Sequence, residues 1–185
     1  MWALDRIRDL RLLFSTREYF AVNLENFWQA ISDSQIGSGI RESGLLFPWI
    51  ETIHVLMVTT VVGTIAIVDL RLMGYGSHRR SARQTIVDLL PLTWGAFAIA
   101  VITGLLLFAS NAQGYIADIQ FLAKMLVLLM AGANMALFHL TSYQQIDQWD
   151  NELAPPLRVR IAGGLSLALW LVVIFLGRWI GFTVE

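Results

Sequence analysis

The sequence predicts an all-α integral membrane protein, a four-helix bundle preceded by an amphipathic helical segment. Of its 185 residues, 56% are hydrophobic and only 15% are charged, whereas soluble chains average about 25% charged residues. Four apolar stretches each approach the ~20 residues that a helix needs to cross a bilayer. The predicted spans cover about 46–72, 86–110, 118–142 and 157–182, within a membrane domain of residues 45–185.

Residues 1–44 are expected to form amphipathic helices that do not cross the membrane. Apolar side chains recur at helical spacing from Leu4 to Phe14, with arginines between them. Ser15 and Glu18 fit a capping box that opens a second helix. We expect these helices to lie along the membrane surface or to pack on the mouth of the bundle. The Gly- and Ser-rich residues 32–39 should end the second helix.

Two sequence features bear on how the spans pack. Pro91 falls near the predicted start of the second span, where a missing N–H is tolerated. Gly132 and Ala136 in the third span have the small-xxx-small spacing that lets a neighbouring helix approach closely.

Arginines in the connections predict the orientation. The first connection holds four arginines and no acid, the second holds no charge, and the third holds Arg158 and Arg160. Positively charged connections stay on the cytoplasmic side. The sequence therefore predicts a bacterial inner-membrane protein with both termini in the periplasm.

Composition excludes several functions. A net charge of −1 does not favour nucleic-acid binding, and the absence of cysteine rules out thiol catalysis, iron–sulfur clusters and cysteine-attached haem. The chain has no glycine-rich phosphate loop, His-Glu-x-x-His or G-x-S-x-G motif. Whether it is an enzyme is therefore left open, with electron transfer as the one activity suggested.

Two histidines lie within the spans at different predicted depths. His54 precedes the middle of the first span by seven residues, and His139 follows the middle of the third by eight. These helices run in the same direction, so a rise of ~1.5 Å per residue separates the two imidazoles by about 20 Å. One metal ion or one haem cannot take both from a single protomer.

The other polar residues of the spans fall into the same two layers. Charged side chains near span ends can extend to the membrane interface without any functional role. This interpretation is preferred for Asp69, Arg71 and Asp88, and it also suits His139. At the depth of His54 and Lys124 an unpaired charge costs roughly 2.5–3.5 kcal/mol, which favours a functional role. The outer layer holds Glu51, His54, Lys124 and Arg178, and the inner layer holds Asp69, Arg71, Asp88 and His139, with Arg158 and Arg160 nearby.

Haem b is the cofactor that this arrangement favours, because neutral imidazole is a common axial ligand of haem iron. His54 would bind an outer haem and His139 an inner one, which would make a transmembrane electron path. Lys124 and Arg178 suit the propionates of a haem, and Glu51 could orient the outer imidazole. Arg71 is the candidate cofactor-binding cation of the inner layer. Each layer has one histidine, so a sixth iron ligand would be weak, absent or borrowed across a homo-oligomer.

Two other functions are kept as alternatives. One is handling of copper or another metal through His54 and Glu51, and the other is a structural or accessory subunit without cofactor. A quinone or protein electron-transfer partner leaves no short signature in a sequence.

Five segments, LFPWIETIHVL, GTIAIVDLRLMG, TGLLLFAS, FLAKMLVLLMAGANMALFH and GRWIGF, resemble those of an uncharacterised family of bacterial four-helix inner-membrane proteins. The resemblance covers about residues 40–182. In architecture alone such proteins are similar to copper-resistance D-type membrane proteins and to haem-b four-helix cytochromes. The resemblance implies the fold and no activity.

Overall fold

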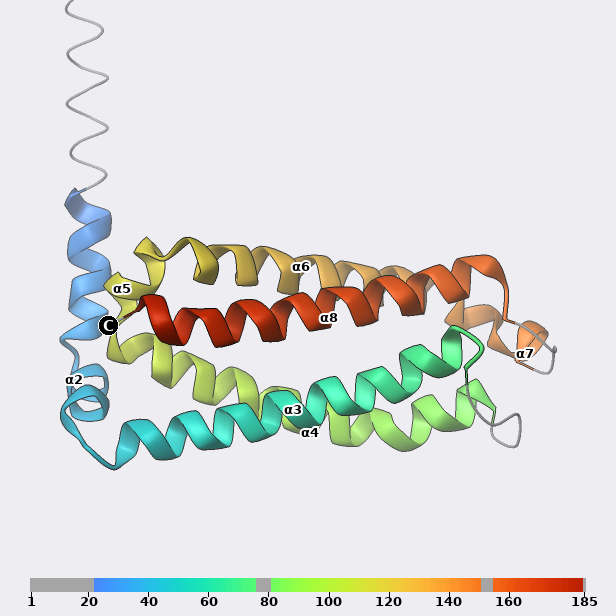
Figure 1. Cartoon of the computed structure of the whole chain (residues 1–185), viewed down its shortest axis with the longest axis horizontal. Coiled ribbons are helices and arrows are strands. Elements are labelled where there is room, and N and C mark those ends of the chain that lie inside the picture. Colours follow the sequence, from blue (N-terminus) through green and yellow to red (C-terminus); the bar gives the residue numbers. More distant parts are fainter. Residues whose placement is uncertain (1–21, 76–80, 151–154, 185) are drawn as a thin grey trace, which may run out of the picture.

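The computed structural model describes residues 22–75, 81–150 and 155–184 (Figure 1). All regular secondary structure in these ranges is helical, so the predicted fold class is confirmed. The helical repeat from Leu4 to Phe14 and the capping box at Ser15 lie outside the described residues.

Four long helices make up the bundle, and each is long and apolar enough to cross a membrane. The arrangement is that of a multi-pass membrane protein. The boundaries agree with the predicted spans to within a few residues. The four helices are α3 (Leu46–Leu72), α4 (Ala82–Ser110), α6 (Ile119–Leu140) and α8 (Leu157–Thr183).

The second span differs most from its prediction. Helix α4 begins at Ala82 because the Ser81 hydroxyl accepts a hydrogen bond from the Gln84 N–H at 3.0 Å, which caps the first turn. Pro91 therefore lies well inside the helix and not near its start as predicted. An interior proline removes one i→i−4 hydrogen bond, so the carbonyl of Val87 lacks its usual helical partner.

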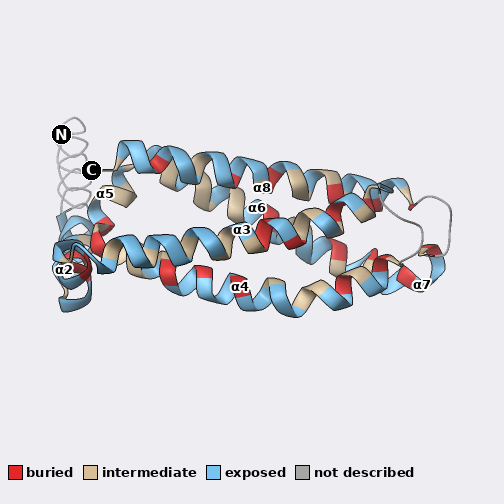
Figure 2. Ribbon diagram, turned by 60° about the horizontal axis from the view of Figure 1, so that its bottom comes forward, coloured by how far each residue is buried: buried red, intermediate tan, exposed pale blue. Residues whose placement is uncertain are grey.

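The four helices pack in the order α4, α3, α8, α6 (Figure 1). Helix α3 lies between α4 and α8, and α6 lies against α8. Across the described residues α4 and α6 share no extended contact, although the rings of Phe108 and Phe121 stack at 5.6 Å near one end. Most outward-facing positions are exposed and apolar (Figure 2), which suits contact with lipid.

Short helices cover one end of the bundle, which we call the α7 end. Here η1 (Tyr143–Gln145) and α7 (Ile146–Trp149) follow α6. The Asp150 carboxylate accepts hydrogen bonds from the N–H groups of Ala82 and Arg83 at 2.6 and 3.2 Å, which joins this connection to the start of α4. The apolar core at this end comprises Leu72, Ala82, Ile86, Phe138, Ile146, Trp149 and Val159.

The opposite end, which we call the α5 end, is covered by α5 (Ala112–Ala117), by α2 (Gln35–Glu42) and by a helical segment over residues 22–32. The segment 22–32 runs across the long axis of the bundle (Figure 1). A helix with that direction at the end of a membrane bundle can lie in the interface plane.

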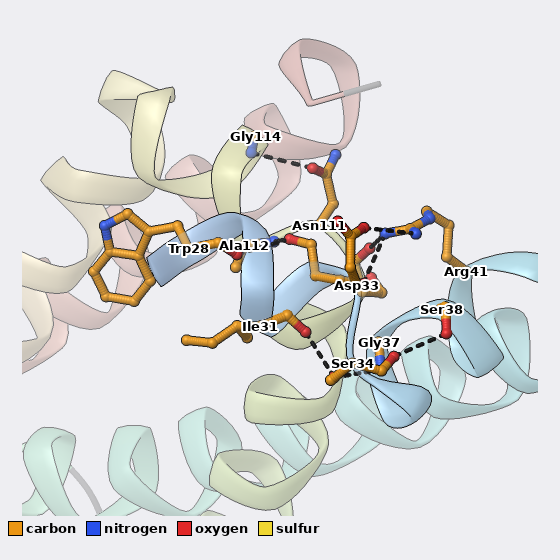
Figure 3. Close-up of polar contacts among 12 residues, drawn as sticks. Trp28, Ile31, Asp33, Ser34, Gly37, Ser38, Arg41, Asn111, Ala112 and Gly114 are labelled. Carbon is orange, nitrogen blue, oxygen red and sulfur yellow. Dashed lines mark hydrogen bonds and ion pairs between the residues drawn. The ribbon is translucent and has the colours of Figure 1, made fainter. Parts of the chain in front are cut away.

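The chain turns sharply between the segment 22–32 and α2. The prediction that residues 32–39 interrupt the helix is correct only at 33–34, because Ser34 caps α2 by accepting a hydrogen bond from the Gly37 N–H at 3.1 Å. The Arg41 guanidinium donates to the carbonyls of Ser32 and Ser110 at 3.0 and 2.9 Å (Figure 3). Arg41 thereby satisfies a carbonyl at the end of α4 and fixes this corner.

Substitution of Gly37 by alanine should destabilise this corner. A Cβ at Gly37 would lie 2.6 and 2.9 Å from the carbonyl oxygens of Ser32 and Ile31, and it would also meet the carbonyl of Ala109. Overpacking of this kind costs about 1–3 kcal/mol, which thermal unfolding in detergent would detect. Gly39→Ala is the matched control, because a Cβ there meets nothing within 4 Å. Equal melting temperatures for the two variants would contradict the close packing.

Candidate functional site

His54 lies on α3 toward the α5 end, and its ring is fixed against α4. Its Nδ1 lies 3.0 Å from the carbonyl oxygen of Ala100 and 3.0 Å from the hydroxyl of Thr103. A carbonyl oxygen only accepts hydrogen bonds, so Nδ1 carries the proton. In the neutral imidazole the lone pair is then on Nε2, which has no hydrogen bond to any residue that the structure describes.

Gly104 makes room for this ring. A Cβ at Gly104 would lie 3.1 Å from Cε1 of His54, so the imidazole rests on the backbone of α4. The hydroxyl of Thr103 donates to the Ile99 carbonyl at 2.8 Å, which leaves its oxygen free to accept from His54. Neither Thr103 nor Gly104 was identified from the sequence, because small and hydroxyl-bearing residues are common in spans and their role depends on the rotation of α4.

Lys124 and Glu51 share the surroundings of His54. Both interact electrostatically with the imidazole, Lys124 from α6 and Glu51 from one turn earlier on α3. The ammonium of Lys124 lies 5.3 Å from the centroid of the Phe121 ring. Burial, and secondarily the negative charge of Glu51, raises the pKa of the Tyr115 hydroxyl on α5. The imidazole therefore contacts α4 directly and lies within electrostatic range of charged residues on α3 and α6.

Arg178 does not belong to this group. Its side chain is exposed, and its guanidinium lies 4.6 Å from the centroid of the Phe182 ring, one turn further along α8. This cation–π contact directs the charge along the outside of α8. Of the two outer cations predicted to suit carboxylates near His54, Lys124 is the one that interacts electrostatically with the imidazole.

His139 lies on α6 toward the α7 end and is anchored in a similar way. Its Nδ1 lies 3.0 Å from the carbonyl oxygen of Met135, so Nδ1 donates here as well. The ring lies 5.2 Å from that of Tyr143 and edge-on to Phe138 at 5.6 Å. Its Nε2 also has no hydrogen bond within the described part of the chain.

A cleft of about 210 Å³ lies between α6 and α8, and it is lined by Phe138 but not by His139. Asn134 spans these helices by donating to the Ala162 carbonyl at 3.0 Å, and Arg158, whose guanidinium donates to the Gln145 side chain, contributes the cation. The cleft is lined by Asn134, Leu137, Phe138, Thr141, Ser142, Arg158, Ile161 and Ala162.

The remaining inner-layer residues differ in burial. Asp69 is only 4% exposed, so the expectation that it extends to the interface is wrong. It fails because Asp69 faces α8 and not lipid. Arg71 is half-buried and Asp88 is exposed.

The two histidines lie toward opposite ends of the bundle. Phe138, which precedes His139, shares the core of the α7 end with Leu72. His54 precedes Leu72 by 18 residues on α3, or about 27 Å at the rise of an α-helix. One centre within a protomer therefore cannot use both imidazoles.

Comparison with known proteins identifies no relative whose site could be set beside this one. No family model, no curated protein and no solved structure matches the chain. The assignment of a function to this site therefore depends only on the arrangement of its own residues.

Proposed function

We propose that the protein is a haem b-binding electron-transfer protein of the membrane, with His54 and His139 as iron ligands of two separate haems. The observation that carries the proposal is the anchoring of each imidazole through Nδ1 on a backbone carbonyl. A histidine ligand of a metal almost always donates its second ring N–H in this way, which fixes the tautomer and presents Nε2.

A haem suits the residues better than a bare metal ion does. Within the described ranges, no three or more His, Cys, Asp or Glu side chains come together in a group that could hold a metal ion. Copper or zinc takes most of its ligands from the protein. Haem iron already has four porphyrin nitrogens and needs only one or two axial side chains. Single, well-anchored histidines are therefore matched to haem.

The cations near each histidine support the same assignment. A haem carries two propionates, which need positive partners in a low-dielectric setting. Lys124 provides one within electrostatic range of His54, and Arg158 lines the cleft between α6 and α8 together with Phe138, which precedes His139. The haem would supply the one-electron chemistry when bound. The protein would hold the imidazoles, neutralise the propionates and exclude water.

A second copy of the chain is the proposed source of a sixth ligand. Helix α6 packs on α8 but has no extended contact with α4 across the described residues, and a Cβ at Gly132 would meet nothing within 4 Å. The predicted small-residue face of Gly132 and Ala136 therefore faces outward and could receive a second protomer. Equal residues of two protomers lie at equal depth, so a two-fold axis could bring the same histidine to both faces of one haem.

We place the protein in the bacterial inner membrane, with the α5 end and both termini on the periplasmic side. The arginines of the first and third connections support this orientation. Electrons would pass between partners at the two faces, either a quinone or another redox protein.

The proposal is tested by an absorbance spectrum of protein purified from haem-replete cells. We expect a Soret band, and an α band in the reduced-minus-oxidised difference. The absence of both bands, with a folded protein confirmed by circular dichroism, would reject the haem and favour an accessory subunit.

Alanine at Gly104 should weaken the site at His54. The added Cβ would lie 3.1 Å from Cε1 and push the imidazole away from its partners on α4. Loss of such a supporting hydrogen bond weakens metal binding by about 10-fold or more, which a haem titration of apoprotein would measure. Gly95→Ala is the control on the same helix, because its Cβ meets nothing within 4 Å. Equal affinities would show that the ring position does not matter.

A further inference from the structure

Asp69 is a carboxyl group buried within the membrane-spanning part of the protein and not used by the proposed haem sites. It lies on α3, about one turn before the α7 end of that helix, and is 4% exposed. Its Oδ2 is buried and has no hydrogen-bond partner among the described residues. The side chain of Ser166 on α8 is close enough to the carboxyl group to interact with it.

The contact between α3 and α8 closes over this carboxyl. A Cβ at Gly163 would lie 2.9 Å from the carbonyl oxygen of Asp69 and 3.0 Å from Cβ of Leu72. The two backbones therefore approach closely one turn before Ser166. This packing restricts the access of water to Asp69.

In the described ranges, the other charged residues of α3, α4 and α8 in this half of the bundle are Arg71, Arg83, Asp88, Arg158 and Arg160. On α3, Arg71 is two residues further on, about 200° around the helix. On α8, Arg158 and Arg160 precede Ser166 by eight and six residues and are exposed. On α4, Asp88 is exposed.

An ionised carboxylate with a buried oxygen that lacks a hydrogen-bond partner is costly in such a site, and its free energy is lowered when it binds a proton. A protonated carboxyl gains an O–H that can donate, and the nearby Ser166 hydroxyl can act as a donor or an acceptor.

We propose that Asp69 and Ser166 form a proton-binding site in the half of the bundle nearest α7, with the Asp69 carboxyl protonated at neutral pH. The ligand is one proton, taken up by the carboxylate as the carboxylic acid, with no change in oxidation state. Intramembrane carboxyls of this kind mark proton pathways. The hydroxyl pair of Thr64 and Thr93, at 2.8 Å between α3 and α4, is the next polar group along α3 toward His54. The site does not require bound haem.

Infrared spectroscopy of the full-length protein in lipid bilayers tests the proposal. The carbonyl stretch of a protonated carboxylic acid should be present at neutral pH, should shift when aspartate alone is labelled with ¹³C, and should disappear at alkaline pH. Asp69→Asn should abolish the band, and Asp88→Asn, which alters an exposed aspartate near the same end, should leave it unchanged. The isotope shift assigns the band to aspartate in the wild-type protein even if the Asp69→Asn variant does not fold.

The proposal is overturned if no aspartic acid band is present at neutral pH, or if the band persists in folded Asp69→Asn protein. Either result is independent of the haem spectrum, so failure here and failure of the proposed electron-transfer function can be distinguished.

Discussion

Alanine in place of Gly163 is expected to lower the free energy of unfolding by about 1–3 kcal/mol, because the new Cβ overpacks the contact between α3 and α8. That Cβ would lie 2.9 Å from a backbone oxygen of Asp69 and 3.0 Å from Cβ of Leu72. Backbone atoms cannot move aside as a flexible side chain can, so the two helices must separate. Unfolding in mixed micelles with increasing denaturing detergent would measure the loss.

Gly63→Ala is the matched control for Gly163→Ala. Both glycines lie inside long apolar helices, but a Cβ at Gly63 on α3 meets nothing within 4 Å. Alanine is a better helix former than glycine by about 1 kcal/mol, so the control should be as stable as the wild type or more so. If Gly163→Ala matched its control, the close approach of α3 to α8 would be wrong.

Replacement of His54 by phenylalanine is expected to remove about half of the bound haem, and His139→Phe should remove the other half, because each ring serves one iron. Haem content per protomer, measured as the pyridine complex, gives the ratio directly. The double variant should bind essentially none while keeping its helical circular dichroism spectrum.

His78 provides the control histidine, since it lies in the connection between the first two spans. His78→Phe should leave the haem content unchanged. Loss of all haem in either single variant would indicate one shared centre and contradict two separate sites.

The sequence was sufficient to predict the spans, because apolar stretches near 20 residues with few charges are typical of transmembrane helices. The first helix matches its prediction at Leu46–Leu72. The first residues of α4 and of the short α2 were less predictable, because each helix start is set by a single capping serine. The separation of His54 from His139 could be estimated because the rise of a helix is constant.

Other features of the site depend on how the helices rotate about their axes, which one sequence does not specify. Thr103 and Gly104 meet His54 only because that face of α4 turns toward α3. Arg178 has a similar predicted depth to Lys124, but it faces outward toward Phe182. Asp69 is close to a span end, where charges usually reach water, yet the glycine at position 163 lets α8 cover it.

A redox titration of the reduced-minus-oxidised α band, in the wild type and in the two single histidine variants, tests the central claim most directly. If His54 and His139 hold separate haems, the wild-type titration should need two one-electron components, and each variant should retain a different one. A single component in the wild type that disappears in both variants, or no absorbance change at all in haem-loaded folded protein, would contradict the account.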